Sequence, residues 1–153
     1  MIIIRDTREQ EPWSLNFFTD VREYRVQGLK TGDYTMFGYE DLLCIERKKS
    51  PSEISINLGS KWKTFEKELK RMEPIKHKYI ICEFPEYYLD TFPVNSGIPE
   101  RLWKDIRISS AFLKMRLYQE TIRYNIQLIF SANKSEAEIR AIEIFRDTQD
   151  LYE

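Results

Sequence analysis

Short apolar runs that alternate with helical patterns constrain the fold of this chain more than any other feature. In the second half of the sequence, the runs at 78–84 and 126–130 are each followed by a segment with helical spacing. Short apolar runs are typical of buried strands, and strands that alternate with helices pair in parallel beneath those helices. The alternation therefore predicts an α/β fold.

In the first half of the chain the pattern predicts strands joined by tight turns, as in a hairpin or meander. Ile2-Ile3-Ile4 and residues 24–27 predict two strands, and residues 34–37 and 42–48 flank a glycine-containing turn that predicts a hairpin. The predicted order is one strand, two or three strands of a meander, and then helix and strand in turn up to a final helix. We expect a three-layer α/β/α sandwich with a central mixed sheet.

The helices are predicted from spacing and from capping residues. Ser50 and Ser135 are predicted to cap two helices, and Pro74 to end a third. Apolar side chains at three- and four-residue spacing predict apolar stripes on two helices. These stripes are Trp62, Phe65, Leu69 and Met72 in the first, and Ala111, Phe112, Met115, Tyr118 and Ile122 in the second.

Composition limits the class of protein. The 153 residues, 42% hydrophobic and 32% charged, are enough for one ordinary domain, which we expect to comprise residues 1–153. No apolar run reaches the roughly 20 residues of a membrane span, and the first charge comes too early for a signal peptide. Cys44 and Cys82 lie in apolar stretches, which predicts reduced core thiols in an intracellular protein. With a single histidine, catalysis must depend on carboxylates, lysines or arginines.

Positive charge is concentrated in the middle of the chain, although the net charge is only −1. Residues 46–78 contain ten Lys or Arg against five Asp or Glu. Clustered Lys and Arg side chains are typical of proteins that bind a partner carrying phosphates. The alternative is a solvated helix face, which produces the same charge run.

Two carboxylates and a lysine are the residues that say most about a possible catalytic site. The predicted hairpin returns Glu46 toward Asp33, and Lys48 follows Glu46 by two residues, so that both project from one face of a strand. Carboxylates bind hard divalent cations, which activate water against phosphodiesters, and a lysine orients or deprotonates that water or stabilises charge. This is the D…(D/E)xK pattern of metal-dependent nucleases; a surface salt bridge on an edge strand is the alternative.

The surrounding residues extend the pattern. Asp6-Thr7-Arg8-Glu9 follows the first strand, Gly32-Asp33 precedes the hairpin, and Glu46-Arg47-Lys48 ends its second strand. In order and spacing these motifs resemble DxRE, GD and ERKxxxD of the nuclease domain of the XPF/Hef family of structure-specific endonucleases. The resemblance covers nearly the whole chain, and its specificity lies in the three motifs together. It implies a restriction-endonuclease-like fold and Mg²⁺-dependent cleavage of branched, flap or fork DNA in repair, recombination or replication, with Mn²⁺ as a substitute.

The resemblance also implies roles for individual residues. Asp33 and Glu46 correspond to metal ligands, either for one ion or for two, and Lys48 corresponds to the catalytic lysine. Asp6 and Glu9 are expected to line the same acidic pocket as further catalytic residues, either touching the metal or ordering Arg8. Because these carboxylates converge, we expect raised carboxylate pKa values in the metal-free protein.

Five cations are candidates for DNA contact. Arg8 and Arg47, the second also in the catalytic set, are expected either to contact phosphate or to hold the carboxylates in place. Lys49, Lys61 and Lys63 are expected to follow the DNA backbone beside the site, with a solvated helix face as the alternative for them.

Two departures from the family pattern affect these expectations. The last aspartate of the family motif falls on Ser52, and Glu53, one residue later, is the alternative acidic group. The sequence ends at Glu153 without the family's tandem helix-hairpin-helix tail, which implies a minimal form.

The resemblance leaves partners and alternatives open. The helices near 111–122 and after 135 are the region expected to form a homodimer or heterodimer, with an intramolecular core face as the default. The expected location is the cytoplasm of a prokaryotic or virus-infected cell, or the nucleus. Competing functions are a Holliday-junction resolvase or restriction-like nuclease of the same superfamily, and a non-catalytic DNA-binding subunit.

Overall fold

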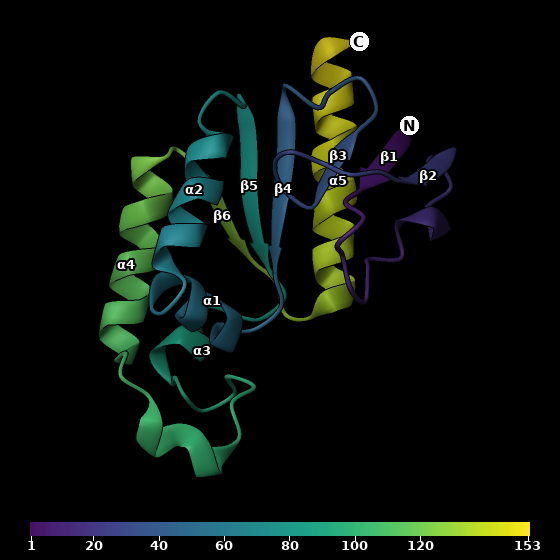
Figure 1. The fold of residues 1–153 in the computed structure, drawn as a ribbon. Coiled ribbons are helices and arrows are strands. Elements are labelled where there is room, and N and C mark those ends of the chain that lie inside the picture. Colours follow the sequence, from purple (N-terminus) through teal and green to yellow (C-terminus); the bar gives the residue numbers. More distant parts are fainter.

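The computed structural model describes all 153 residues and centres on one mixed six-stranded sheet with the strand order β2-β1-β3-β4-β5-β6 (Figure 1). The strands are β1 (Ile2–Arg5), β2 (Glu23–Val26), β3 (Tyr34–Met36), β4 (Leu43–Lys48), β5 (His77–Cys82) and β6 (Gln127–Phe130). β4, β5 and β6 are parallel, as the alternation of strand and helix predicts, and β3 is antiparallel to both β1 and β4.

The position of β2 differs from the predicted meander. β2 pairs in parallel with the outer side of β1, with Ile2 opposite Glu23, and forms one edge of the sheet. The chain between these strands instead runs through a short 3₁₀ turn at Leu15–Phe17. A parallel pair needs a crossover rather than a tight turn, so no turn motif in the sequence revealed this pairing. Only β3 and β4 form the predicted hairpin.

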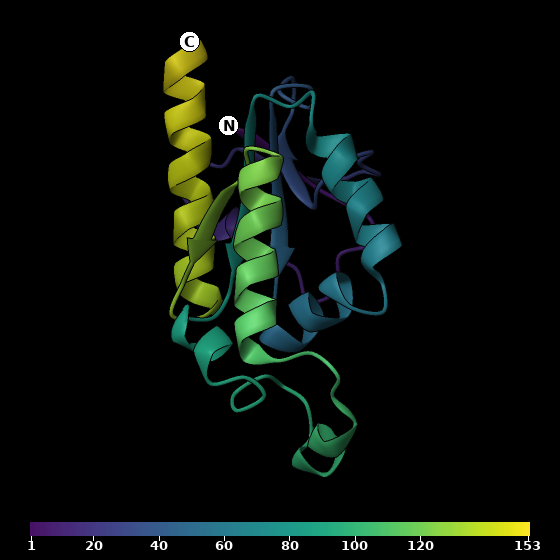
Figure 2. The ribbon, with the colours of Figure 1, turned by 90° about the vertical axis from the view of Figure 1, so that its left-hand side faces the viewer.

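Helices cover both faces of the sheet, which confirms the predicted three-layer architecture (Figures 1 and 2). On one face lie α1 (Pro51–Leu58), α2 (Trp62–Met72) and α4 (Ser110–Arg123); on the other lies α5 (Lys134–Tyr152). The first face buries side chains such as Ile54, Phe65, Leu69 and Leu113, and the second buries Ala141, Ile142 and Phe145. None of the helices combines the length and hydropathy needed to cross a lipid bilayer.

The face of α4 that packs on the sheet differs from the predicted stripe. Leu113 and Leu117 are buried, whereas Phe112, Met115 and Ile122 are 39%, 49% and 75% exposed. The helix carries two apolar stripes, and spacing alone does not say which of them meets the core. The expectation that these three exposed residues face the core is therefore wrong.

The helix ends follow capping chemistry, with one correction. The Ser50 hydroxyl accepts the backbone N–H of Glu53, as expected of an N-cap. At α5, however, the cap is Asn133, whose Oδ1 accepts the N–H of Glu136 at 2.9 Å, and the predicted cap Ser135 is already inside the helix. Both residue types cap well, so the sequence did not separate positions two residues apart.

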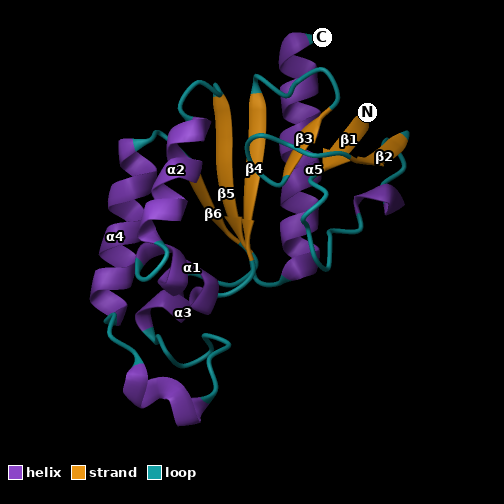
Figure 3. Cartoon of the chain, in the orientation of Figure 1, coloured by secondary structure: helices purple, strands orange, loops and turns teal.

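The segment between β5 and α4 extends beyond the end of the sheet (Figure 3). It contains α3 (Tyr87–Asp90), which the sequence did not predict, and a 3₁₀ helix at Glu100–Asp105 that follows Pro99. Cys44 and Cys82 are buried and free, as expected of core thiols.

Candidate active site

Asp33 lies where β3 begins between the carboxyl ends of β1 and β4. Its N–H donates to the Ile45 carbonyl, its carbonyl accepts the Asp6 N–H, and its Oδ2 accepts the Arg47 N–H, each at 2.8 Å. Both neighbouring strands therefore fix this carboxylate.

Gly32 makes this position of Asp33 attainable. Its φ is +73°, and a Cβ there would lie 3.1 Å from both the Cys44 Cβ and the Ile45 carbonyl oxygen. Only glycine adopts this backbone conformation without strain so close to β4. The Gly-Asp pair is thus a structural unit that places a carboxylate against the hairpin.

Glu46 and Lys48 project from the face of β4 that α1 and α2 cover, the same face as Cys44. The Lys48 Nζ lies 3.5 Å from Glu46 Oε1 and 3.6 Å from Glu53 Oε1, and 4.8 Å from the centre of the Phe65 ring. The lysine side chain is 5% exposed, so its ammonium group is held in place by carboxylates rather than by water.

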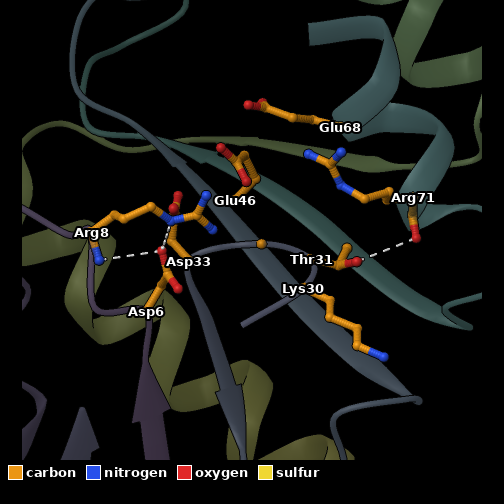
Figure 4. A pocket seen from close by; sticks show the side chains of 9 residues that line it. Asp6, Arg8, Lys30, Thr31, Asp33, Glu46, Glu68 and Arg71 are labelled. Atoms are coloured by element: carbon orange, nitrogen blue, oxygen red, sulfur yellow. Dashed lines mark hydrogen bonds and ion pairs between the residues drawn. The ribbon is translucent and has the colours of Figure 1, made fainter. Parts of the chain in front are cut away.

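The two predicted metal ligands line one pocket of about 220 Å³ (Figure 4). None of the residues that line it is hydrophobic. The lining residues are Asp6, Arg8, Lys30, Thr31, Gly32, Asp33, Glu46, Glu68 and Arg71. The structure thus brings the two carboxylates to one polar pocket, with the lysine beside the second of them.

The electrostatics of this pocket disfavour two free carboxylates. Desolvation by the surrounding protein, followed by the charges of Glu46 and Glu9, raises the pKa of Asp33 to about 9. Desolvation also raises the pKa of Glu46; Lys48 opposes this shift, and Glu68 adds to it. These two shifts have the expected direction.

Asp6 behaves differently from the other pocket carboxylates. Desolvation acts to raise its pKa, but the ion pair with Arg8 at 2.7 Å and the N–H of Leu29 outweigh that effect and lower it. The expectation of a raised pKa is therefore wrong for Asp6. Its paired carboxylate orders Arg8, which is the second of the two roles that the resemblance implied.

Lys48 retains its proton in this environment. Burial acts to lower the pKa of its ammonium group, but the nearby carboxylates of Glu46 and Glu53 outweigh burial and raise it. A protonated lysine donates hydrogen bonds and supplies a positive charge, and it cannot accept a proton.

Arg47 lies on the opposite face of β4 from Glu46 and Lys48. Its guanidinium group contacts Glu83 at 2.5 Å, Glu9 at 3.0 Å and the Glu11 carbonyl at 2.7 Å, and its side chain is only 1% exposed. This burial contradicts a contact between Arg47 and phosphate. Of its two expected roles, the geometry supports the holding of carboxylates.

The network around Arg47 fixes the segment after β1. The Trp13 indole N–H donates to Glu83 at 2.6 Å, and the Trp13 ring stacks on Tyr34 with centroids 4.5 Å apart. The Tyr34 hydroxyl donates to Glu9 at 2.8 Å. Glu9 therefore lies in this network and not among the residues that line the pocket.

The expected DNA-binding cations are distributed unevenly around the pocket. The Arg8 side chain is 77% exposed and lines the pocket. Lys49, whose Nζ donates to the Gln10 carbonyl, does not line it, and neither do Lys61 and Lys63 near the start of α2. At about 1.5 Å of rise per residue, that end of the helix lies roughly 15 Å from Arg71 at the other end.

Sequence reasoning missed four residues that line the pocket: Lys30, Thr31, Glu68 and Arg71. The last two are three residues apart on α2, so they share one helix face beside its buried side chains. Helical periodicity shows this shared polar face, but it does not show that the face meets the hairpin.

The structure also places the two candidates for the last acidic position. The Ser52 N–H donates to the Ser96 carbonyl, whereas the Glu53 carboxylate extends to the Lys48 ammonium. The acidic group beside the lysine is therefore Glu53.

The donor set suits a hard divalent cation that keeps part of its water shell. No group of three or more His, Cys, Asp or Glu side chains is arranged to enclose a metal ion. Mg²⁺ is commonly held by one or two carboxylates, with water and substrate phosphate completing the shell. Asp33 and Glu46 meet this requirement, and a cation would stabilise the charged forms that desolvation disfavours when it raises their pKa values.

Comparisons with known proteins support the fold. No protein-family model matches the sequence, and no curated protein matches it either. Solved structures do match, among them XPF from Aeropyrum pernix and the same protein in complex with DNA, with TM-scores of 0.70 and 0.69 and 20% sequence identity. Each of these two matches covers 97% of this chain and 65% of the other chain. The chain therefore shares the fold of XPF, which confirms the resemblance at that level, and spans 65% of the length of those chains.

Proposed function

We propose that this chain is a Mg²⁺-dependent endonuclease that hydrolyses phosphodiester bonds in DNA, with a preference for branched, flap or fork structures. The observation that carries this proposal is the shared pocket of Asp33 and Glu46, whose pKa values are raised, beside the buried ammonium group of Lys48. The fold of XPF, including an XPF structure in complex with DNA, supports the proposal.

Each polar side chain has a defined task in this proposal. Asp33 and Glu46 hold the cation, which when bound lowers the pKa of a coordinated water and neutralises charge on the phosphate. Lys48 donates hydrogen bonds to the attacking water or to a phosphate oxygen, in an orientation that Glu46 and Glu53 fix. Arg8, ordered by Asp6, binds the phosphate from the exposed side.

Competing functions differ in substrate or in catalysis. A Holliday-junction resolvase or restriction-like enzyme would use the same carboxylates on four-way junctions or plain duplex. A non-catalytic DNA-binding subunit would not need an ordered lysine, so the contacts of Lys48 with Glu46 and Glu53 favour an active site.

The test is cleavage of an end-labelled fork in Mg²⁺ or Mn²⁺. We expect wild-type protein to cut the fork, Asp33→Ala to lose cleavage, and Asp105→Ala, which alters an exposed carboxylate outside the pocket, to cut like wild type. Flaps, four-way junctions and duplex tested in parallel define the preferred structure. Equal cutting by wild type and Asp33→Ala would overturn the proposal, because the activity would then come from another site or another protein.

A further inference from the structure

A second cavity continues the candidate pocket along the surface. It has a volume of about 570 Å³ and shares three lining residues with the pocket, namely Lys30, Thr31 and Arg71. One wall is the segment 27–31 that precedes β3, and the other is the end of α2 with the residues that follow it. The two cavities therefore adjoin at these residues and make up a groove along the surface that leads away from the carboxylates.

Two cations without ionic partners stand where the cavities join. Lys30 and Arg71 are exposed, and neither side chain takes part in an ion pair or a hydrogen bond. By contrast, Arg47 is fully paired, and Lys70, which lines the second cavity, lies 3.8 Å from Glu66. The side chains at the junction are thus free to bind an anion.

The positive charge is local to this junction. The far part of the second cavity is lined by Glu40 and Asp41, which would repel a phosphate. A phosphate in the groove is therefore favoured next to the carboxylate pocket and not at the distant end. The contact expected from this distribution is with the phosphates adjacent to the reacting one.

Arg8 and Arg71 approach the carboxylates from opposite sides. Figure 4 shows both guanidinium groups extending toward Glu46, the first from the segment after β1 and the second from α2. The Thr31 hydroxyl, 3.5 Å from the Arg71 carbonyl, joins the two walls of the groove. Guanidinium groups bind phosphate oxygens in a forked geometry, so two of them can grip a strand on both sides of a central phosphate.

We propose that Arg71 and Lys30 bind the nucleic-acid strand on the side of the reacting phosphate opposite Arg8, so that the strand passes over Asp33 and Glu46 and then over the contact between segment 27–31 and the end of α2. This inference rests on the proposed nuclease function and adds the path of the strand to it. It also distinguishes this path from one along Lys61 and Lys63 at the other end of α2.

Salt dependence of binding tests the path without relying on cleavage. Binding of a labelled fork is measured in Ca²⁺ over a range of salt concentrations for wild type, for Lys30→Glu with Arg71→Glu, and for Lys67→Glu with Lys76→Glu. The last pair reverses two exposed charges in the same basic stretch that line neither cavity. The logarithmic salt slope should fall by about 0.7 to 0.9 for each phosphate contact removed, so by roughly 1.4 to 1.8 for the groove pair, and should not change for the control pair.

The inference would be overturned if the double variant Lys30→Glu with Arg71→Glu had the same salt slope as wild type. It would also be overturned if only the double variant Lys61→Glu with Lys63→Glu had a reduced slope. Neither result affects the proposed function, which Asp33→Ala tests by cleavage. Absence of any salt-dependent binding by wild type would overturn both.

Arg71→Gln and thermal denaturation guard against misfolding of the charge-reversed protein. The neutral variant should keep the melting temperature of wild type, and its salt slope should fall by about half as much as that of the groove pair. Arg71→Lys keeps the positive charge but loses the forked N–H donors of the guanidinium group, so this variant should cleave fork DNA more slowly than wild type in Mg²⁺.

Discussion

Arg8 and Arg47 carry the same charge in opposite environments, and this difference determines what each contributes. Arg47 is buried among Glu9, Glu83 and a backbone carbonyl, whereas the Arg8 side chain is 77% exposed beside Asp6. Removal of Arg47 leaves two carboxylates desolvated and unpaired, whereas Asp6, itself 3% exposed, keeps the backbone N–H groups of Arg8 and Leu29 when the Arg8 guanidinium is removed. We therefore assign Arg47 to the stability of the site and Arg8 to contact with the substrate.

Arg47→Leu should lower the free energy of unfolding by about 3 to 5 kcal/mol, because two carboxylates lose their buried partner. Arg8→Leu should lower stability by less than Arg47→Leu, because Asp6 keeps two backbone N–H donors, and should weaken fork binding. Urea denaturation of both variants beside wild type measures the difference. Equal stability of the two variants would show that the network around Arg47 does not hold the segment after β1.

The raised pKa of Asp33 makes the stability of the metal-free protein depend on pH. Its pKa rises from 3.8 in the unfolded chain to about 9 in the folded one, so the folded state binds this proton more tightly. This contribution is fully present below about pH 4 and is lost as the pH rises toward 9.

Asp33→Asn should therefore gain stability relative to wild type as the pH is raised, with no further gain above about pH 9. Thermal denaturation in EDTA across this range provides the measurement. At pH 8, millimolar Mg²⁺ should raise the melting temperature of wild type and leave that of Asp33→Asn unchanged. Parallel pH curves for the two proteins would contradict the assignment of the shift to Asp33.

At the scale of single elements, the first turn of α1 determines which acidic residue meets Lys48. Ser50 caps the helix and Pro51 occupies its first position. In this frame Ser52 turns its N–H to the Ser96 carbonyl, and Glu53 reaches the lysine. Relative to the ERKxxxD pattern that the sequence resembles, the carboxylate beside the lysine thus stands one residue later.

Glu53→Gln should reduce fork cleavage by about 10- to 100-fold, the usual effect of removing a group that orients a catalytic residue. Ser52→Ala is the matched control in the same turn and should cut like wild type. The Lys48 ammonium loses one of its two carboxylates in Glu53→Gln, so the pH profile of cleavage should also shift. Equal loss in both variants would point to damage to the helix start rather than to the loss of a carboxylate.

The elements and residues that could be predicted from the sequence are those with local signals. β4, β5 and β6 follow apolar runs, and Asp33 and Glu46 belong to a hairpin whose turn is visible in the sequence. The pairing of β2 and the contribution of Arg71 to the pocket depend on contacts between distant segments, which leave no local pattern. Arg47 is a similar case: a cation on a strand faces either solvent or core, and its partners Glu9 and Glu83 lie 38 and 36 residues away.

At the scale of the whole molecule, α4 presents an apolar surface that its own core does not use. Phe112, Met115 and Ile122 lie on the side of this helix turned away from the sheet. The resemblance to XPF/Hef nuclease domains implied either a core face or a dimer face for this region. Exposure removes the first option for these three residues and leaves dimerisation as a prediction.

If two copies associate through α4, Ile122→Asp should yield monomers while wild type sediments as a dimer. Lys104→Asp changes charge at an exposed site outside α4 and serves as the control. Analytical ultracentrifugation across a range of protein concentrations measures the mass. A monomeric wild type at all concentrations would contradict the prediction and leave the nuclease proposal unaffected.

The alternation of side chains along β4 couples the site to the core in a way that limits how this protein can vary. Cys44, Glu46 and Lys48 lie on one face, and Ile45 and Arg47 on the other. The insertion or deletion of one residue in this strand would exchange the two sets, moving the lysine beneath α5 and the arginine into the pocket. The pairing of β4 and the make-up of the candidate site are therefore coupled, so a variant that keeps the fold can alter the site by point substitution but not by a change in the length of this strand.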